Sequence, residues 1–254
     1  MGRAGRIAAC LVAAGCAAAS AEAAGADRYV VYAGVWRTAA GGTGRIGDAG
    51  TGSEFDLGDV GSGGDTSAFE AGFWFHPRGR HRLRFAAFDL SAGGAGTAPE
   101  ELLADGLDLP AGTPVTSSYD LRLFEAQYAW AFVNLDVVDV SVLVGIDGMD
   151  ARTSIRAASG RASGGASGAA PVVGVAARFQ PVSFVRVVGE ASYGGWGGRF
   201  DRVRDLSVRA EFYVIRLFGL GLGYRDLEVR ADDSGEGAVD TTQRGFQAFA
   251  LFRF

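Results

Sequence analysis

The chain has 254 residues, with 24 Lys and Arg against 29 Asp and Glu, and a formal net charge of −5. Every basic residue is Arg, and no basic patch with interleaved aromatic residues occurs, so the sequence gives no support for nucleic-acid binding. The 40 glycines follow no three-residue period, which excludes collagen and suits turns and strands that bend around a barrel.

The N-terminus predicts a cleavable secretory signal peptide, residues 1–23. Two arginines precede a short apolar stretch at residues 7–14, and residues 21–23 (Ala-Glu-Ala) have the small-x-small form that signal peptidase requires. The alternative is lipidation at Cys16. Cleavage after Ala23 by signal peptidase would start the mature chain at residue 24.

The mature chain, residues 24–254, is predicted to be one barrel domain. Cys10 and Cys16 both fall inside the signal, so the mature chain has no thiol, disulfide or thiolate metal site. No later apolar run approaches the roughly twenty residues that a spanning helix requires. A membrane location therefore requires strands, which points to an outer membrane of the Gram-negative type.

Ten strand-like segments follow one another along the mature chain. Their connections alternate between long and short, as in bacterial barrels that turn tightly in the periplasm and carry long loops outside. Eight or twelve strands stay open as alternatives, because residues 53–57 could add a short strand. The segments are 29–38, 67–76, 81–90, 118–132, 137–149, 170–179, 182–193, 202–212, 215–230 and 238–254. The first three long connections are 39–64, 91–117 and 151–169.

The last segment has a clear two-residue period. Every second residue from Phe254 back to Phe246 is apolar, whereas the residues between them are mixed. A bare aromatic edge strand would recruit other strands, and a closed barrel removes that edge by pairing the last strand with the first. We therefore predict an all-β fold, a closed antiparallel up-and-down transmembrane β-barrel. A secreted β-sandwich is the soluble alternative.

The same alternation directs a set of charged side chains inward. Charge on the lipid face of a barrel costs about 2–4 kcal/mol at the midplane, so these groups lie in the lumen and must pair. A lumen plugged by Arg–Glu pairs and a narrow pore with rearranging pairs are both consistent with this. Six inward glycines, among them Gly72 and Gly221, would widen the lumen. The predicted lumen charge network is Glu70, Arg84, Glu125, Arg178, Arg186, Glu190, Arg209, Glu211 and Arg225.

The sequence gives little support for catalysis or for metal binding. His76 and His81 flank the first short turn, which is periplasmic in this topology, and the chain has no Lys. No spacing marks a carboxylate pair, and the acids of the first loop lack regular calcium spacing. We predict no enzyme, no cofactor and no metal.

Three motifs carry a resemblance that spans the mature chain. They are Asp56-Leu57-Gly58 in the first loop, His81-Arg82-Leu83-Arg84 after the first tight turn, and Gly221-Leu222-Gly223-Tyr224 near the end. The chain resembles bacterial outer-membrane β-barrel proteins, in particular a group of largely uncharacterised exported barrels. The resemblance implies that Phe252 and Phe254 form the signal that the outer-membrane barrel assembly machinery reads.

These observations predict a monomeric integral barrel of the cell outer membrane. Its expected role is structural and surface-interacting, or passive passage of small solutes. The alternative is an outer-membrane barrel hydrolase that acts on lipid or peptide at the cell surface. The expected partners are outer-membrane lipid, lipopolysaccharide and the barrel assembly machinery. The sequence leaves the ligand and the conducting state undetermined.

Overall fold

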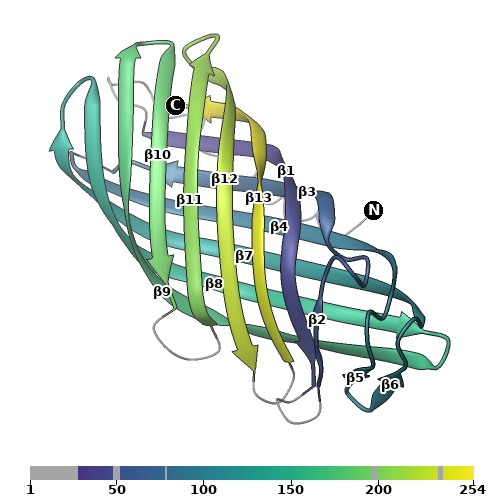
Figure 1. The fold of residues 1–254 in the computed structure, drawn as a ribbon. Helices are drawn as coiled ribbons and strands as arrows, with labels where there is room; N and C mark the ends of the chain where they lie inside the picture. The colour runs from purple at the N-terminus through teal and green to yellow at the C-terminus, as the bar shows by residue number, and fades with distance from the viewer. Residues whose placement is uncertain (1–27, 48–51, 78, 196–199, 234–236) are drawn as a thin grey trace.

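Ten long strands form a closed antiparallel barrel in the computed structural model (Figure 1). It describes residues 28–47, 52–77, 79–195, 200–233 and 237–254, so the predicted signal peptide lies outside the described residues. Consecutive barrel strands pair, and β13 pairs with β1 to close the ring, which confirms the predicted fold and ten strands. The barrel strands are β1 (Tyr29–Ile46), β3 (Gly64–Phe75), β4 (His81–Thr97), β7 (Pro114–Asn134), β8 (Val138–Ala157), β9 (Gly160–Val182), β10 (Val185–Gly194), β11 (Phe200–Tyr213), β12 (Phe218–Asp233) and β13 (Gly237–Arg253).

Three short strands lie outside the ring. β2 (Glu54–Asp56) pairs with the far part of β1 and corresponds to the additional strand considered at 53–57. β5 (Leu102–Ala104) and β6 (Leu107–Leu109) form a hairpin in the loop after β4. Its two turn residues, Asp105 and Gly106, have φ values of 47° and 79°, as a type I′ turn requires. In the described part of the chain, no helix is long and apolar enough to span a membrane.

The two ends of the barrel differ. Short connections join β3 to β4, β7 to β8, β9 to β10 and β11 to β12 at one end, which we call the turn end. The other end, the loop end, carries β2 and the β5–β6 hairpin (Figure 1). The chain finishes at the turn end, where the Tyr29 amide donates to the Phe254 carbonyl at 2.8 Å and the Phe254 amide donates back at 3.0 Å. The terminal residue is therefore paired at the seam.

Much of the predicted loop sequence at the loop end is strand. β1 continues to Ile46 and β4 to Thr97, although the sequence predicted loops from residues 39 and 91. β8 and β9 form one long hairpin with a turn at residues 158–159, inside the predicted connection 151–169. The predicted alternation of long and short connections is wrong at this hairpin. The chain extends the wall of the barrel instead.

The two faces of β7 exchange polarity part way along the strand. Outward residues are apolar from Phe132 to Phe124, and the next outward residue towards the loop end is Arg122. Inward residues change in the opposite sense, from the buried carboxylate of Glu125 to the buried side chain of Leu123. An apolar outer face suits lipid, whereas a polar outer face over an apolar interior suits water.

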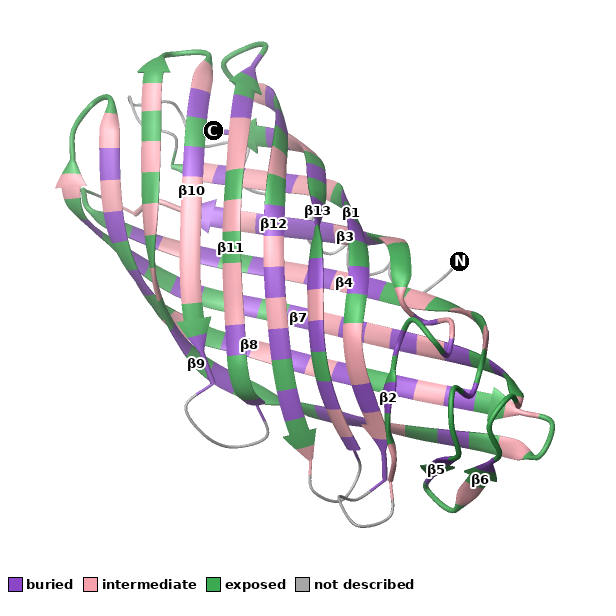
Figure 2. Cartoon of the chain, viewed as in Figure 1, coloured by how far each residue is buried: buried purple, intermediate pink, exposed green. Residues whose placement is uncertain are grey.

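The same exchange occurs on β12. Tyr224 is the last outward aromatic residue and Asp226 follows it, whereas inward Arg225 is followed by inward Leu227. We call the part with the apolar outer face the lipid level, and the part towards the loop end the outer level. In Figure 2 the buried and the more exposed residues follow one another in bands along most of the strands, in both levels. Exposed apolar side chains of the lipid level include Phe124, Val142, Val144, Ile146, Val175, Val208, Leu220, Leu222, Phe246 and Phe252.

Buried apolar side chains fill the interior of the outer level. Trp36, Leu121 and Leu227 come from different parts of the wall and are fully buried in one cluster. Leu57, from the loop between β2 and β3, covers this cluster, and its amide donates to the Gly42 carbonyl at 2.9 Å. The outer level is therefore built like the core of a soluble β-sandwich, with polar residues outside.

The inward glycines of the lipid level do not widen the lumen as predicted. A Cβ atom at Gly72 would collide with the ring of Tyr32, and one at Gly221 would collide with the ring of Phe249. At these two positions the missing side chains therefore make room for aromatic rings from neighbouring strands. The rings occupy the space that open glycines would have left.

Candidate functional site

Arg225 on β12 is the centre of a charged cluster inside the barrel. Its guanidinium pairs with Glu70 of β3 at 3.2 Å, Glu125 of β7 at 2.7 Å and Asp205 of β11 at 2.7 Å. The Arg225 side chain is 2% exposed, so these carboxylates replace its water. β7 lies five strands from β12 in both directions around the ring, and one side chain thus joins opposite walls.

Two further arginines extend this cluster towards the turn end. Arg84 pairs with Glu125 at 3.0 Å and with Glu190 at 3.1 Å. Arg209 also pairs with Glu190, at 3.0 Å, and with Glu211 at 3.1 Å. Positive and negative groups therefore alternate across the lumen, which is the arrangement that compensates the cost of burying each ion.

Neutral side chains donate hydrogen bonds to two of the buried carboxylates. The Tyr32 hydroxyl donates to Glu70 at 3.1 Å, and the Gln247 amide donates to the other oxygen at 2.7 Å. The Gln127 amide donates to Asp147 at 3.3 Å. These amide and hydroxyl groups add donors to the buried carboxylates, whereas the Arg84 Nε and Gln127 Oε1 atoms are buried without a hydrogen-bond partner.

A second group of charges lies at the turn end. Arg82 forms a two-fold ion pair with Asp139, whose carboxylate also accepts a hydrogen bond from the Ser141 hydroxyl. Arg186 donates to the Tyr213 hydroxyl at 2.9 Å and lies 3.5 Å from the carboxylate of Glu211. This group is linked to the Arg225 cluster, because Glu211 also accepts from Arg209.

All nine residues of the predicted charge network lie in the lumen, and ion pairs connect eight of them. Arg178 is the exception, because no described residue pairs with it and its Nε atom is buried without a hydrogen-bond partner. The connected residues are Glu70, Arg84, Glu125, Arg186, Glu190, Arg209, Glu211 and Arg225.

The predicted network omitted several members that the structure adds. Arg82, Asp139 and Asp205 belong to ion pairs, and Gln247 and Tyr32 hold Glu70. Each has the inward parity of its strand, so the alternation that selected the nine residues also marks these. A prediction that included every inward polar residue, acids and amides alike, would have found them.

Comparison with known proteins identifies the fold. No protein-family model matches the sequence, and no curated protein is similar to it. The chain is similar to the crystal structure of outer membrane protease OmpT from Escherichia coli, with a TM-score of 0.63 and 11% identity over 92% of this chain and 99% of that one. The fold is that of a bacterial outer-membrane β-barrel. At this identity the likeness concerns the fold alone.

Two other solved barrels are more distant. The translocator domain of the autotransporter NalP from Neisseria meningitidis has a TM-score of 0.42 and 12% identity, over 99% of this chain and 96% of that one. The attachment invasion locus protein Ail of Yersinia pestis has a TM-score of 0.39 and 9% identity, over 88% and 99%.

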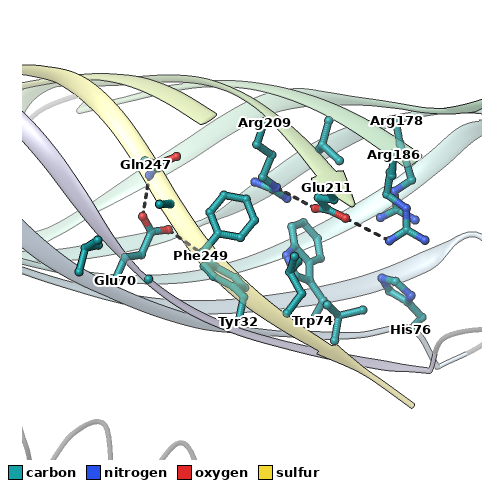
Figure 3. A pocket seen from close by; sticks show the side chains of 16 residues that line it. Tyr32, Glu70, Trp74, His76, Arg178, Arg186, Arg209, Glu211, Gln247 and Phe249 are labelled. Carbon is teal, nitrogen blue, oxygen red and sulfur yellow. Dashed lines mark hydrogen bonds and ion pairs between the residues drawn. The ribbon is translucent and has the colours of Figure 1, made fainter. Parts of the chain in front are cut away.

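A small cavity lies inside the barrel, between the Arg225 cluster and the turn end. Its volume is about 30 Å³, which holds about two water molecules. Figure 3 shows Arg178 and Arg186 beside one another at one side of it, with Trp74 and His76 nearby. The cavity is too small to be a channel for hydrated solutes.

A larger hollow lies in the wall of the outer level. It has a volume of about 440 Å³, and β7, β8 and β9 form it. Its lining is polar, with several hydroxyl groups beside Arg152 and Asp150. Such a surface offers hydrogen-bond donors and acceptors to a polar ligand. The lining residues are Ser118, Asp120, Asp150, Arg152, Thr153, Ser154, Arg161, Ser163, Gly164, Gly165, Ala166 and Ser167.

Both histidines and both residues of the predicted assembly signal lie at the turn end. His81 contacts the Tyr128 hydroxyl, and His76 lines the small cavity. Phe252 is 49% exposed on the lipid face, and Phe254 is paired with Tyr29. Among the described residues, no group of three or more His, Cys, Asp or Glu side chains could hold a metal ion.

Proposed function

We propose that this protein is a monomeric, integral outer-membrane barrel with a closed lumen, which acts through its outer surface as a structural or surface-interacting protein. The proposal includes export through the cleavable signal peptide. It includes recognition of Phe252 and Phe254 by the barrel assembly machinery. The turn end then faces the periplasm, and the outer level projects from the cell.

The observation that carries the proposal is the double closure of the barrel interior. At the lipid level, ion pairs from opposite walls meet at Arg225. At the outer level, the apolar cluster around Trp36 and Leu121 leaves both side chains with 0% exposure. A solute would have to separate buried ion pairs and then open a packed apolar core. The packed interior therefore supports a closed lumen better than a conducting pore.

The surface around the barrel supports contact with lipopolysaccharide. Arg37, Arg122, Arg204 and Arg244 are the first outward basic residues beyond the apolar face on their strands. At this height guanidinium groups can meet the phosphates of a lipid headgroup, and Arg binds phosphate bidentately. We therefore propose lipopolysaccharide as the surrounding lipid. The polar hollow on β7, β8 and β9 would then face the sugars above those phosphates.

Single-channel recording tests the closed lumen. Refolded mature protein in a planar bilayer should give no discrete current steps, with a porin in the same bilayer as positive control. Heat-modifiable gel migration of the same sample should show a folded barrel. Discrete steps that change when Glu70 is replaced by Gln would overturn the closed lumen and establish a small pore.

Two further assays address the surface role. The barrel should melt at a higher temperature in lipopolysaccharide than in phospholipid, and Arg244→Gln should reduce that difference. An equal melting temperature in both lipids would contradict the proposed lipid contact. We also propose that the barrel is not an enzyme; turnover of lipid or peptide substrates by the purified protein would establish the hydrolase alternative.

A further inference from the structure

Arg178 is a half-buried arginine of the lumen that the ion pairs leave out. Its neighbours in the ladder are Asp139 on β8 and Val188 on β10. Asp139 is engaged by Arg82 and by the Ser141 hydroxyl, and Val188 is apolar. Among the described residues Arg178 has no ion-pair partner, and its buried Nε atom has no acceptor. A buried donor without an acceptor is costly, so this unpartnered Nε atom calls for a reason.

Positive charge exceeds negative charge around Arg178. Among the described residues that line the small cavity, three are arginines (Arg178, Arg186 and Arg209) and two are acids (Glu70 and Glu211). Both oxygens of Glu211 already accept hydrogen bonds, from Arg209 and from the Tyr213 hydroxyl. Glu211 is therefore already engaged, and it forms no ion pair with Arg178.

The small cavity lies at this position. Arg178, Arg186 and Arg209 line it together with Trp74 and His76, and Figure 3 draws Arg178 and Arg186 on the same side of the cavity. Its volume of about 30 Å³ suits the oxygen end of a carboxylate or phosphate, which occupies about the space of two waters. A planar guanidinium with an unused N–H matches such an oxyanion.

We propose that Arg178, together with Arg186, binds a single oxyanion, the carboxylate or phosphate group of a molecule that enters from the turn end. The oxyanion supplies the acceptor that Arg178 lacks and offsets the local excess of positive charge. Trp74 and Tyr32 provide apolar walls for the atoms that carry the oxyanion. This site is independent of conduction, since it requires access from one end only.

Calorimetric titration of the refolded barrel in detergent tests the site. Inorganic phosphate and acetate are added separately at low ionic strength, with chloride as the control. Wild type should bind one oxyanion saturably, and Arg178→Gln should bind at least about tenfold more weakly, which is about 1.4 kcal/mol. The stronger of the two titrants then identifies the group. Arg156→Gln, an exposed arginine of the outer level, should bind as wild type does.

A second variant provides the carboxylate internally. Val188 is the cross-strand partner of Arg178 and lines the cavity, so Val188→Glu places an acid beside the guanidinium. This variant should lose oxyanion binding and should melt no lower than wild type, because the Arg178 guanidinium gains a partner. The proposal is overturned if wild type gives no saturable heat, if chloride binds equally well, or if Val188→Glu binds phosphate as wild type does.

Discussion

The guanidinium carbon of Arg225 lies 5.5 Å from the ring centre of Trp36, at the border between the charged lumen and the apolar core of the outer level. The ring of Phe88 lies 5.8 Å away on the same side. On the side of the lipid level, the guanidinium forms ion pairs with acids. On the side of the outer level, it forms cation–π contacts with the two aromatic rings. One side chain therefore connects two interiors of opposite polarity, and its loss should affect both.

Replacing Arg225 by Gln should strongly destabilise the barrel. The change leaves Glu70, Glu125 and Asp205 without their shared cation in a water-poor interior. Breaking a buried ion pair costs about 3–5 kcal/mol, and we expect a loss of that size in the free energy of unfolding. Urea unfolding in lipid vesicles measures it. Arg230→Gln, on the outer surface of the same strand, should stay within about 0.5 kcal/mol of wild type.

The boundary between the lipid level and the outer level can be located with one substituent at two heights. Val208→Arg puts a charge on the lipid face of β11, where Val208 is 52% exposed, and should cost about 2–4 kcal/mol. Thr242→Arg puts the same charge on the outer level of β13, beside Glu228 in the ladder, and should cost less than about 0.5 kcal/mol. Equal costs in vesicle unfolding would show that the boundary is misplaced.

The loop that contains Leu57 should behave as part of the core. Leu57 is fully buried, so Leu57→Ala leaves a cavity and should cost about 2–5 kcal/mol. Hydrogen exchange should also become faster at the Leu57 amide, which donates to Gly42. Leu103, 43% exposed in the β5–β6 hairpin, is the matched control, and Leu103→Ala should change neither measurement appreciably.

Stability above pH 10 should depend on Tyr119. Burial raises the pKa of this phenol, although hydrogen bonds with Thr241 and Gln243 partly oppose the shift. The unfolded chain then loses its proton at about pH 10 while the folded chain keeps it, so this residue's contribution falls as pH rises above 10. The free energy of unfolding should therefore fall by about 1.4 kcal/mol per pH unit because of this residue.

Comparison of unfolding free energies at pH 9 and pH 11 measures this effect. The fall between the two pH values should be smaller in Tyr119→Phe than in wild type. An identical pH dependence in Tyr119→Phe and wild type would rule out a buried phenol at this position.

The lipid level of the fold could be predicted from the sequence, and the outer level could not. At the lipid level only apolar side chains suit the outward face, so the alternation from Phe124 to Phe132 is easy to read. Beyond Arg122 the outward face meets water and the inward face is apolar, so the same strand continues with the pattern reversed. The residues of β9 from Gly160 to Ala169 are mostly small, and the sequence therefore predicted a loop there.

Two local signals would have improved the prediction. The dipeptide Asp105-Gly106 between short apolar runs indicates a type I′ hairpin, and the structure has one there. Counting every inward polar residue would have added Asp205 and Arg82 to the charge network. Which charged residues pair within that network depends on which strands face one another across the lumen. The spacing of residues along the sequence does not show which strands are opposite.

The exchange of polarity along β7 and β12 also favours the correct register of these strands in the barrel. A slip of one residue in β7 would turn Glu125 towards lipid and Leu123 towards water at the same time. In a strand with a single apolar face, such a slip misplaces side chains in one environment only. In β7 it places a charged residue in lipid at one height and an apolar residue in water at another. Misaligned intermediates are thereby penalised twice, and the correct pairing of the long seam between β1 and β13 gains selectivity during assembly.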